Sequence, residues 1–171
     1  MSKSQKTGRT HRIVAIACLV AINIILSRWL SISMWNSKIG FAFIPVALAG
    51  ILLGPLAAGL TGAIGDFLGA ILFPIGPYFP GFTLTAFIIG IVYGSFIKKS
   101  QKTRNIVCAV LINQILLSFL LNTLWISILY GSPYLSLIKV RSIQTIILIV
   151  IEIVVIKVFV KYIPQLKKAA L

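Results

Sequence analysis

Two carboxylates, Asp66 and Glu152, are the only acidic side chains in this chain of 171 residues, and each lies inside an apolar run. Ionisable groups in such runs are costly and usually mark a functional site. Asp66 is soon followed by residues 73–82, FPIGPYFPGF, which are too rich in proline to form a helix. We interpret Asp66 and this aromatic loop as one side of a small-molecule site.

Four basic residues suggest the charge of the molecule that binds there. Most of the 16 Lys and Arg residues cluster at the two ends of the chain and at residues 98–104, as expected of cytoplasmic segments. The others are Arg28, Lys38, Lys139 and Arg141, and this topology places all four outside. They either contact lipid headgroups or bind an anionic solute. We favour the solute for Arg28 and Arg141, which lie close to helix interiors.

The sequence offers little for catalysis. His11 is the single histidine and belongs to the basic N-terminal tail, while Cys18 and Cys108 show no paired spacing. Two acids cannot build a multi-carboxylate metal cluster, and neither an HExxH motif nor a phosphate-binding P-loop is present. We therefore predict no enzyme, no catalytic residue, no cofactor and no metal. The expected function is solute binding, with energy supplied by another protein.

The composition predicts the scaffold that positions these groups. Hydrophobic residues make up 59% and charged residues 11%, whereas soluble domains are about one quarter charged. The chain is thus expected to be an all-α integral membrane protein, a single domain over residues 1–171. Its net charge of +14 lies beside apolar spans, which favours contact with anionic lipid over nucleic acid. The predicted spans are about 13–30, 41–53, 56–73, 82–97, 106–130 and 135–163.

Six spans with both termini in the cytoplasm place residues 31–40, 73–82 and 131–134 outside. The first of these loops reads SISMWNSKIG and includes Trp35. It is either an interfacial loop or a lid over an outward-facing pocket. The second, third and fourth spans are short, and short spans are tolerated only where protein or a cavity satisfies their backbone groups.

Small residues predict close helix contacts. Ala17 and Ala21 are four apart on the first span and share a face, which favours close approach of another helix. From spacing alone, packing inside the protein is their simplest role. The third span carries a glycine stripe at spacings of three and four: Gly59, Gly62, Gly65 and Gly69.

Polar residues follow one face of the fifth span. Gln114, Ser118 and Asn122 recur every four residues, and Trp125 extends the same face outward. This stripe is expected to face the site.

With these features in place, residues 40–94 resemble the substrate-specificity subunits, or S components, of bacterial energy-coupling factor transporters, and most closely the folate-specific ones. The most specific part reads IGDFLGAILFPIGPYFPGFTLTA. The resemblance implies six helices in the bacterial cell membrane, with a vitamin site near the outer face that outer loops close. It also implies a transmembrane coupling protein (T component) and two cytoplasmic ATPases as partners, toppling of the subunit during transport, and contact of Ala17 and Ala21 with the coupling protein.

Folate chemistry then suggests roles for the candidate residues. The pterin N–H groups need an acceptor such as Asp66 or Asn122, and the glutamate carboxylates need Arg28 or Arg141, with Lys38 and Lys139 as further candidates. Aromatic faces for the pterin ring are offered by Tyr78, Phe79, Phe82 and Trp125.

Other interpretations remain open. Asp66 could instead form an internal ion pair with Arg28 or Arg141, and the aromatic residues could belong to an interface belt. At the level of function, the alternatives are an S component for another anionic vitamin and a small structural membrane protein.

Overall fold

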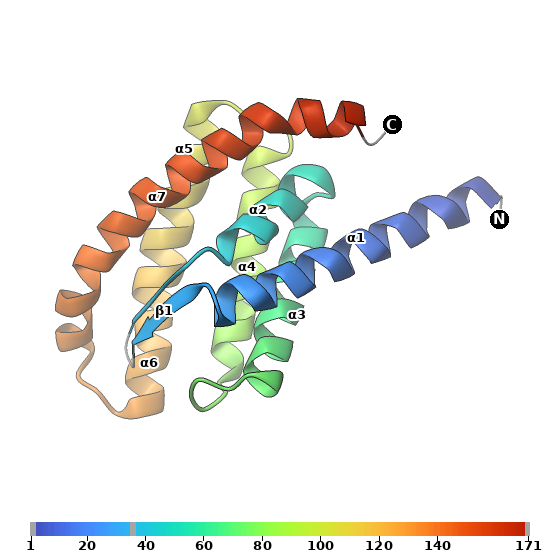
Figure 1. The fold of residues 1–171 in the computed structure, drawn as a ribbon. Coiled ribbons are helices and arrows are strands. Elements are labelled where there is room, and N and C mark those ends of the chain that lie inside the picture. Colours follow the sequence, from blue (N-terminus) through green and yellow to red (C-terminus); the bar gives the residue numbers. More distant parts are fainter. Residues whose placement is uncertain (1–2, 35–36, 170–171) are drawn as a thin grey trace.

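The computed structural model describes the backbone of residues 3–34 and 37–169, and the side chains of residues 10–31 and 40–162. Within these ranges the chain is a bundle of helices with one small β-hairpin beside it (Figure 1). The helices are α1 (Lys3–Arg28), α2 (Phe43–Leu52), α3 (Pro55–Leu72), α4 (Pro80–Ile97), α5 (Thr103–Leu111), the π-helix η1 (Ile112–Leu121), α6 (Asn122–Tyr130) and α7 (Tyr134–Ala169). The segments α5, η1 and α6 follow one another without a break and form one long rod.

Five of the described helical segments are long and apolar enough to cross a membrane. Large apolar side chains cover their outer surfaces, with Leu135 74% exposed and Ile143 68% exposed, as suits contact with lipid. The second predicted span, residues 41–53, corresponds to α2, an apolar helix of only 10 residues. At about 1.5 Å per residue it reaches roughly half of a 30 Å hydrocarbon layer.

The shortness of α2 has a local cause. The helix begins only after the hairpin, and Gly54, at a positive φ of 102°, ends the turn that leads to Pro55 at the start of α3. Most of its residues are buried among the longer helices, so α2 is a core element (Figure 1).

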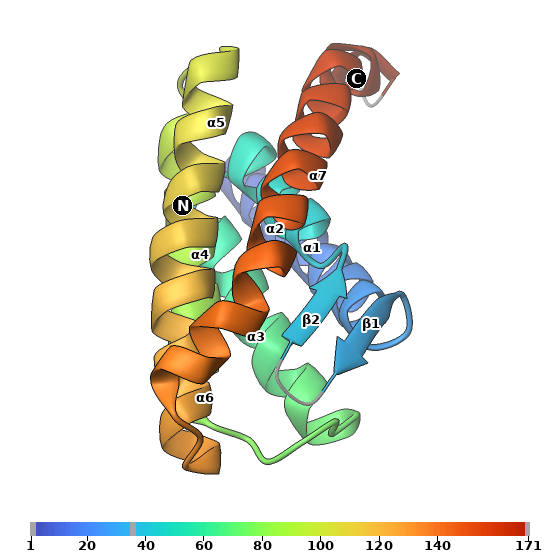
Figure 2. The same ribbon diagram turned by 90° about the vertical axis from the view of Figure 1, so that its left-hand side faces the viewer.

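The bundle is helical as predicted, and residues 31–40, expected as a loop, contain two antiparallel strands. β1 (Ser31–Met34) pairs with β2 (Ser37–Gly40), and Ser31 lies opposite Gly40 (Figure 2). Pairing of the two strands gives their backbone N–H and C=O groups hydrogen-bond partners outside any helix. The Ser31 hydroxyl donates to the Ser27 carbonyl at 2.6 Å, which ties β1 to the end of α1. Trp35, the centre of the predicted lid, lies outside the described residues.

Glycines bring α3 and α4 into backbone contact. A Cβ on Gly94 would lie 2.3 Å from the Pro55 Cα, and one on Gly62 would lie 2.5 Å from the Ala86 carbonyl oxygen. Real Cβ atoms are not found so close to backbone atoms, so these positions require glycine. The close contact holds the two helices that carry Asp66 and Tyr93 at a fixed spacing.

A π-helix interrupts the long rod between α5 and α6. Its i→i+5 hydrogen bonds widen the turn over Ile112–Leu121, and such segments occur frequently at functional sites. The predicted polar stripe Gln114, Ser118 and Asn122 lies along this segment and lines the cavity described next, as expected.

Candidate ligand-binding site

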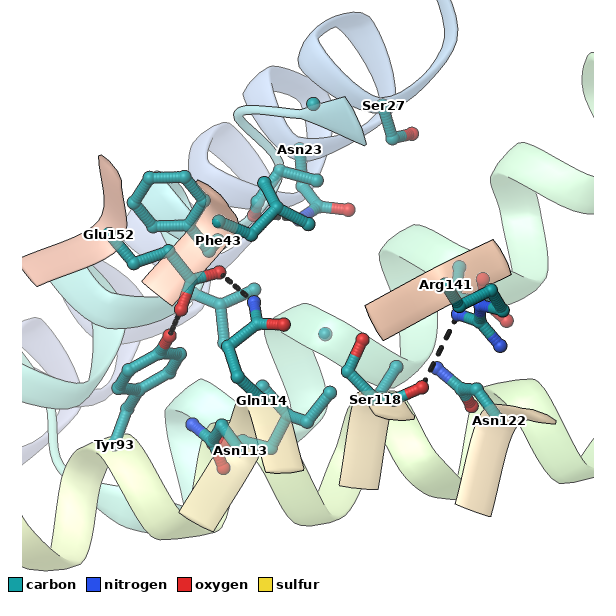
Figure 3. Close-up of a pocket in the computed structure, with 18 residues that line it drawn as sticks. Asn23, Ser27, Phe43, Tyr93, Asn113, Gln114, Ser118, Asn122, Arg141 and Glu152 are labelled. Carbon is teal, nitrogen blue, oxygen red and sulfur yellow. Dashed lines mark hydrogen bonds between the residues drawn. The ribbon is translucent and has the colours of Figure 1, made fainter. Parts of the chain in front are cut away.

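A cavity of about 250 Å³ lies inside the bundle and is lined by residues of α1, β2, α2, α3, α4, η1, α6 and α7 (Figure 3). Its polar lining consists of Asn23, Ser27, Asp66, Tyr93, Asn113, Gln114, Ser118, Asn122, Arg141 and Glu152, and its apolar lining includes Phe43, Val46, Ile89 and Leu148. A few convergent polar groups in an apolar wall are typical of small-molecule sites.

Arg141 forms one end of the cavity. Its side chain is only 7% exposed. One terminal nitrogen donates to the Thr123 hydroxyl at 2.8 Å, and the other donates to the Ser118 carbonyl at 3.3 Å. In the described part of the chain no carboxylate pairs with Arg141, and its Nε has no hydrogen-bond partner. A buried cation without a counterion is strongly destabilising, so this end of the cavity is suited to an anionic ligand.

Glu152 forms the other end and is only 4% exposed. The Tyr93 hydroxyl donates to its Oε2 at 2.7 Å, and the Gln114 Nε2 donates to its Oε1 at 2.7 Å. The three side chains come from α7, α4 and η1, so the cluster depends on the packing of all three segments (Figure 3). Both carboxylate oxygens already accept a hydrogen bond from the protein.

Asp66 lines the cavity from α3 and is tied to the neighbouring loop. The Thr83 hydroxyl donates to its Oδ2 at 2.8 Å, and the Tyr78 hydroxyl lies 3.2 Å from the same Thr83 oxygen. Arg28 lies against Gly69, one turn further along α3, close enough for its charge to interact with that of Asp66. Asp66 therefore both lines the cavity and interacts with Arg28. A ligand contact and an internal ion pair were the alternatives expected for this residue from the sequence.

The structure divides the predicted site residues into two groups. Asp66, Asn122 and Arg141 line the cavity. The residues outside its lining are Arg28, Tyr78, Phe79, Phe82 and Trp125. Arg28 interacts with Asp66 of the lining, and the Tyr78 hydroxyl is linked to Asp66 through Thr83. Lys139 is exposed, and the side chain of Lys38 lies outside the described residues.

The aromatic residues pack on one another near the start of α4. Phe79 lies 5.4 Å from Trp125 and 6.1 Å from Phe82, measured between ring centroids. The Trp125 indole nitrogen donates to the Thr85 hydroxyl at 3.0 Å. This cluster joins the 73–82 loop to α6 beside the cavity.

The predicted site left out several lining residues, among them Asn23, Tyr93 and Glu152. Asn23 and Glu152 had a readable signal, because each is a polar group within an apolar span. Asn23 donates from Nδ2 to the Ala42 carbonyl at 2.8 Å, and a Cβ on Gly65 would lie 2.4 Å from its Oδ1. The glycine stripe of α3 thus faces two neighbours: Gly59 and Gly62 meet α4, whereas Gly65 and Gly69 meet α1.

The fold and the cavity define a multi-pass membrane protein with an internal polar binding site. Comparison with known families gives the identification: residues 7–165 match the model of the ECF-type riboflavin transporter, S component, and the chain belongs to this family of transporter S components. The resemblance of residues 40–94 is thereby confirmed. The family consists of transporter components rather than enzymes, in agreement with the lack of catalytic groups in the sequence.

Individual relatives are similar over most of their length. The Folate transporter FolT of Clostridium novyi (strain NT) is 38% identical over 149 residues, which cover 86% of this chain and 87% of the relative. FolT of Leuconostoc mesenteroides subsp. mesenteroides is 31% identical over 151 residues, which cover 84% of this chain and 81% of the relative. A crystal structure of FolT bound with folic acid has a TM-score of 0.81 at 34% identity and covers 85% of this chain and 91% of that one.

Proposed function

We propose that this chain is the folate-binding S component of an energy-coupling factor transporter. The observation that carries the proposal is Arg141, which is buried beside the cavity without a counterion among the described residues. Folate ends in a glutamate with two carboxylates, and a planar guanidinium binds a carboxylate through two parallel hydrogen bonds. The names of the relatives support folate as the anionic ligand.

The neighbouring polar groups would bind other parts of folate. Asp66 and Asn122 are the proposed acceptors for its N–H groups. The cavity, at about 250 Å³, is somewhat smaller than the roughly 300–1,000 Å³ typical of ligand pockets. The part of folate between the pterin and the glutamate would therefore extend past the cavity towards the 73–82 loop, where Tyr78, Phe79, Phe82 and Trp125 offer aromatic faces.

Riboflavin is the second candidate, because the matching family model is named for it. Riboflavin carries no carboxylate, and binding it would leave the Arg141 guanidinium buried without a counterion. The site therefore favours folate or another anionic vitamin over riboflavin.

Transport would require partner proteins. We propose that the site faces outward while both termini face the cytoplasm of a bacterial cell, and that the subunit topples to release folate inside. A coupling protein and two ATPases would supply the energy. Ala17 and Ala21 are exposed on α1, which supports their proposed role as a contact surface for the coupling protein.

Calorimetry of the purified chain in detergent tests the ligand. Folate should bind saturably at one site, and riboflavin should give no saturable heat. Binding of riboflavin but not folate would overturn the proposal. Proteoliposomes that contain the chain, a coupling protein and both ATPases test the energy source. Folate uptake should require ATP, and equal uptake without ATP would contradict the coupling.

A further inference from the structure

Gln114 lies between the buried carboxylate of Glu152 and the open part of the cavity. The side chain is only 6% exposed. Its Nε2 donates to Glu152 at 2.7 Å, whereas its Oε1 is buried and has no hydrogen-bond partner in the part of the chain that the structure describes. In Figure 3 this oxygen points away from Glu152, into the space between Glu152 and Arg141. A buried carbonyl without a partner is costly, and a donor on a bound ligand would satisfy it.

The direction of the Gln114 amide follows from chemistry. A carboxylate only accepts hydrogen bonds, so it can face the NH₂ group of an amide but not its oxygen. Turning the amide would bring the Gln114 oxygen against the Glu152 oxygen and lose a charge-assisted hydrogen bond. Tyr93 holds the other carboxylate oxygen at 2.7 Å and keeps the carboxylate in place. While Glu152 is ionised, it therefore holds the Gln114 amide with its acceptor oxygen towards the cavity.

We infer that Glu152 is a positioning residue for ligand selectivity: through Gln114 it makes this end of the cavity specific for a heterocycle edge that carries N–H donors. The inference rests on the proposed function and deepens it. The pterin of folate has such an edge, with an exocyclic amino group beside a ring N–H. With the glutamate at Arg141, the pterin would lie at the opposite end, and its amino group would donate to the Gln114 oxygen.

The test compares two ligands by calorimetry in detergent: folate and 2-desaminofolate, which lacks the exocyclic amino group. The unaltered chain should bind folate about tenfold or more tightly than the analogue, because a buried acceptor would be left unpaired by the analogue. Glu152→Gln frees the Gln114 amide to turn. This variant should lose most of its affinity for folate but keep that for the analogue within about threefold, so that the ratio approaches one.

A second variant keeps the inference testable if Glu152→Gln does not fold. Gln114→Met removes the acceptor at similar volume and should also bring the ratio to about one. Gln101→Met is the matched control, because Gln101 is exposed and does not line the cavity. It should leave both affinities unchanged.

Two results would overturn the inference. One is an unaltered chain that binds folate and its desamino analogue equally well. The other is a pair of folded variants that weaken both ligands by the same factor, as a merely structural role would. If the unaltered chain fails to bind folate at all, the proposed function itself is wrong, and this outcome is distinct from a loss of selectivity.

Discussion

Arg141 and Glu152 line the same cavity from one face of α7, about three helical turns and 16 Å apart along its axis (Figure 3). The two opposite charges do not neutralise each other. Glu152 is held by Tyr93 and Gln114, whereas Arg141 is held by Thr123 and the Ser118 carbonyl. The cavity therefore has one end suited to an anion and another end with a fixed acceptor.

The close contact between α3 and α4 makes a prediction about stability. Gly94→Ala would place a Cβ 2.3 Å from the Pro55 backbone. We expect the free energy of unfolding to fall by about 1–3 kcal/mol, because overpacking forces the two backbones apart. Thermal unfolding in detergent measures the change. Gly76→Ala is the control, since its Cβ would meet only the end of the Tyr130 side chain. Equal unfolding temperatures for the two variants would contradict the packing argument.

Asp66 and Arg28 should act on the ligand as a coupled pair. Asp66 lines the cavity and Arg28 does not, so Arg28 should act through Asp66. We expect Asp66→Asn and Arg28→Ala each to weaken folate binding. The double variant should lose less binding free energy than the sum of the two single losses. A coupling of about 0.5–3 kcal/mol is typical of residues in contact.

Calorimetric titration of the four proteins in this cycle measures that coupling. Lys139→Ala serves as the control, because Lys139 is exposed and outside the cavity lining, and it should leave the affinity almost unchanged. Additive losses would instead indicate that Arg28 contacts the ligand independently of Asp66.

The exposed alanines of α1 predict a separation of binding from transport. Replacing Ala17 and Ala21 with Phe should leave folate affinity intact and abolish folate uptake in cells, because bulky groups would block the close approach of a partner helix. Val150→Phe, on the exposed surface of α7, is the control and should leave both properties intact. Loss of folate binding in the variants with Phe at these two positions would indicate that Ala17 and Ala21 pack inside the protein instead.

Much of the fold was predictable from the sequence because lipid imposes long apolar helices. Residues 82–97 were expected as a span, and the structure has α4 at Pro80–Ile97. The hairpin was not predicted, since the alternation in residues 31–34 and 37–40 is too short to distinguish a strand from a loop. The second span was expected to be short, but its place in the protein core was not predicted, because hydropathy alone does not show whether an apolar segment lies in lipid or in the core.

The site was predicted where a single residue carried its own signal. Asp66 and Arg141 are charged groups in apolar surroundings, and Asn122 lies on a polar stripe. Tyr93 carried no such signal, because its role depends on α4 packing beside η1 and α7. The aromatic loop was predicted to form one side of the site, whereas Phe79 packs on Phe82 and Trp125 and all three lie outside the cavity lining.

Arg141 is proposed to bind a ligand carboxylate, and a charge-neutral ligand tests this most directly. Folate and a derivative with both glutamate carboxylates converted to amides should be titrated into the unaltered chain and into Arg141→Gln. The unaltered chain should bind folate about 30-fold or more tightly than the diamide, since a buried charge pair that loses one partner costs about 2–5 kcal/mol. Arg141→Gln should bind the two ligands with similar affinity. Equal binding of both ligands by the unaltered chain would contradict the account.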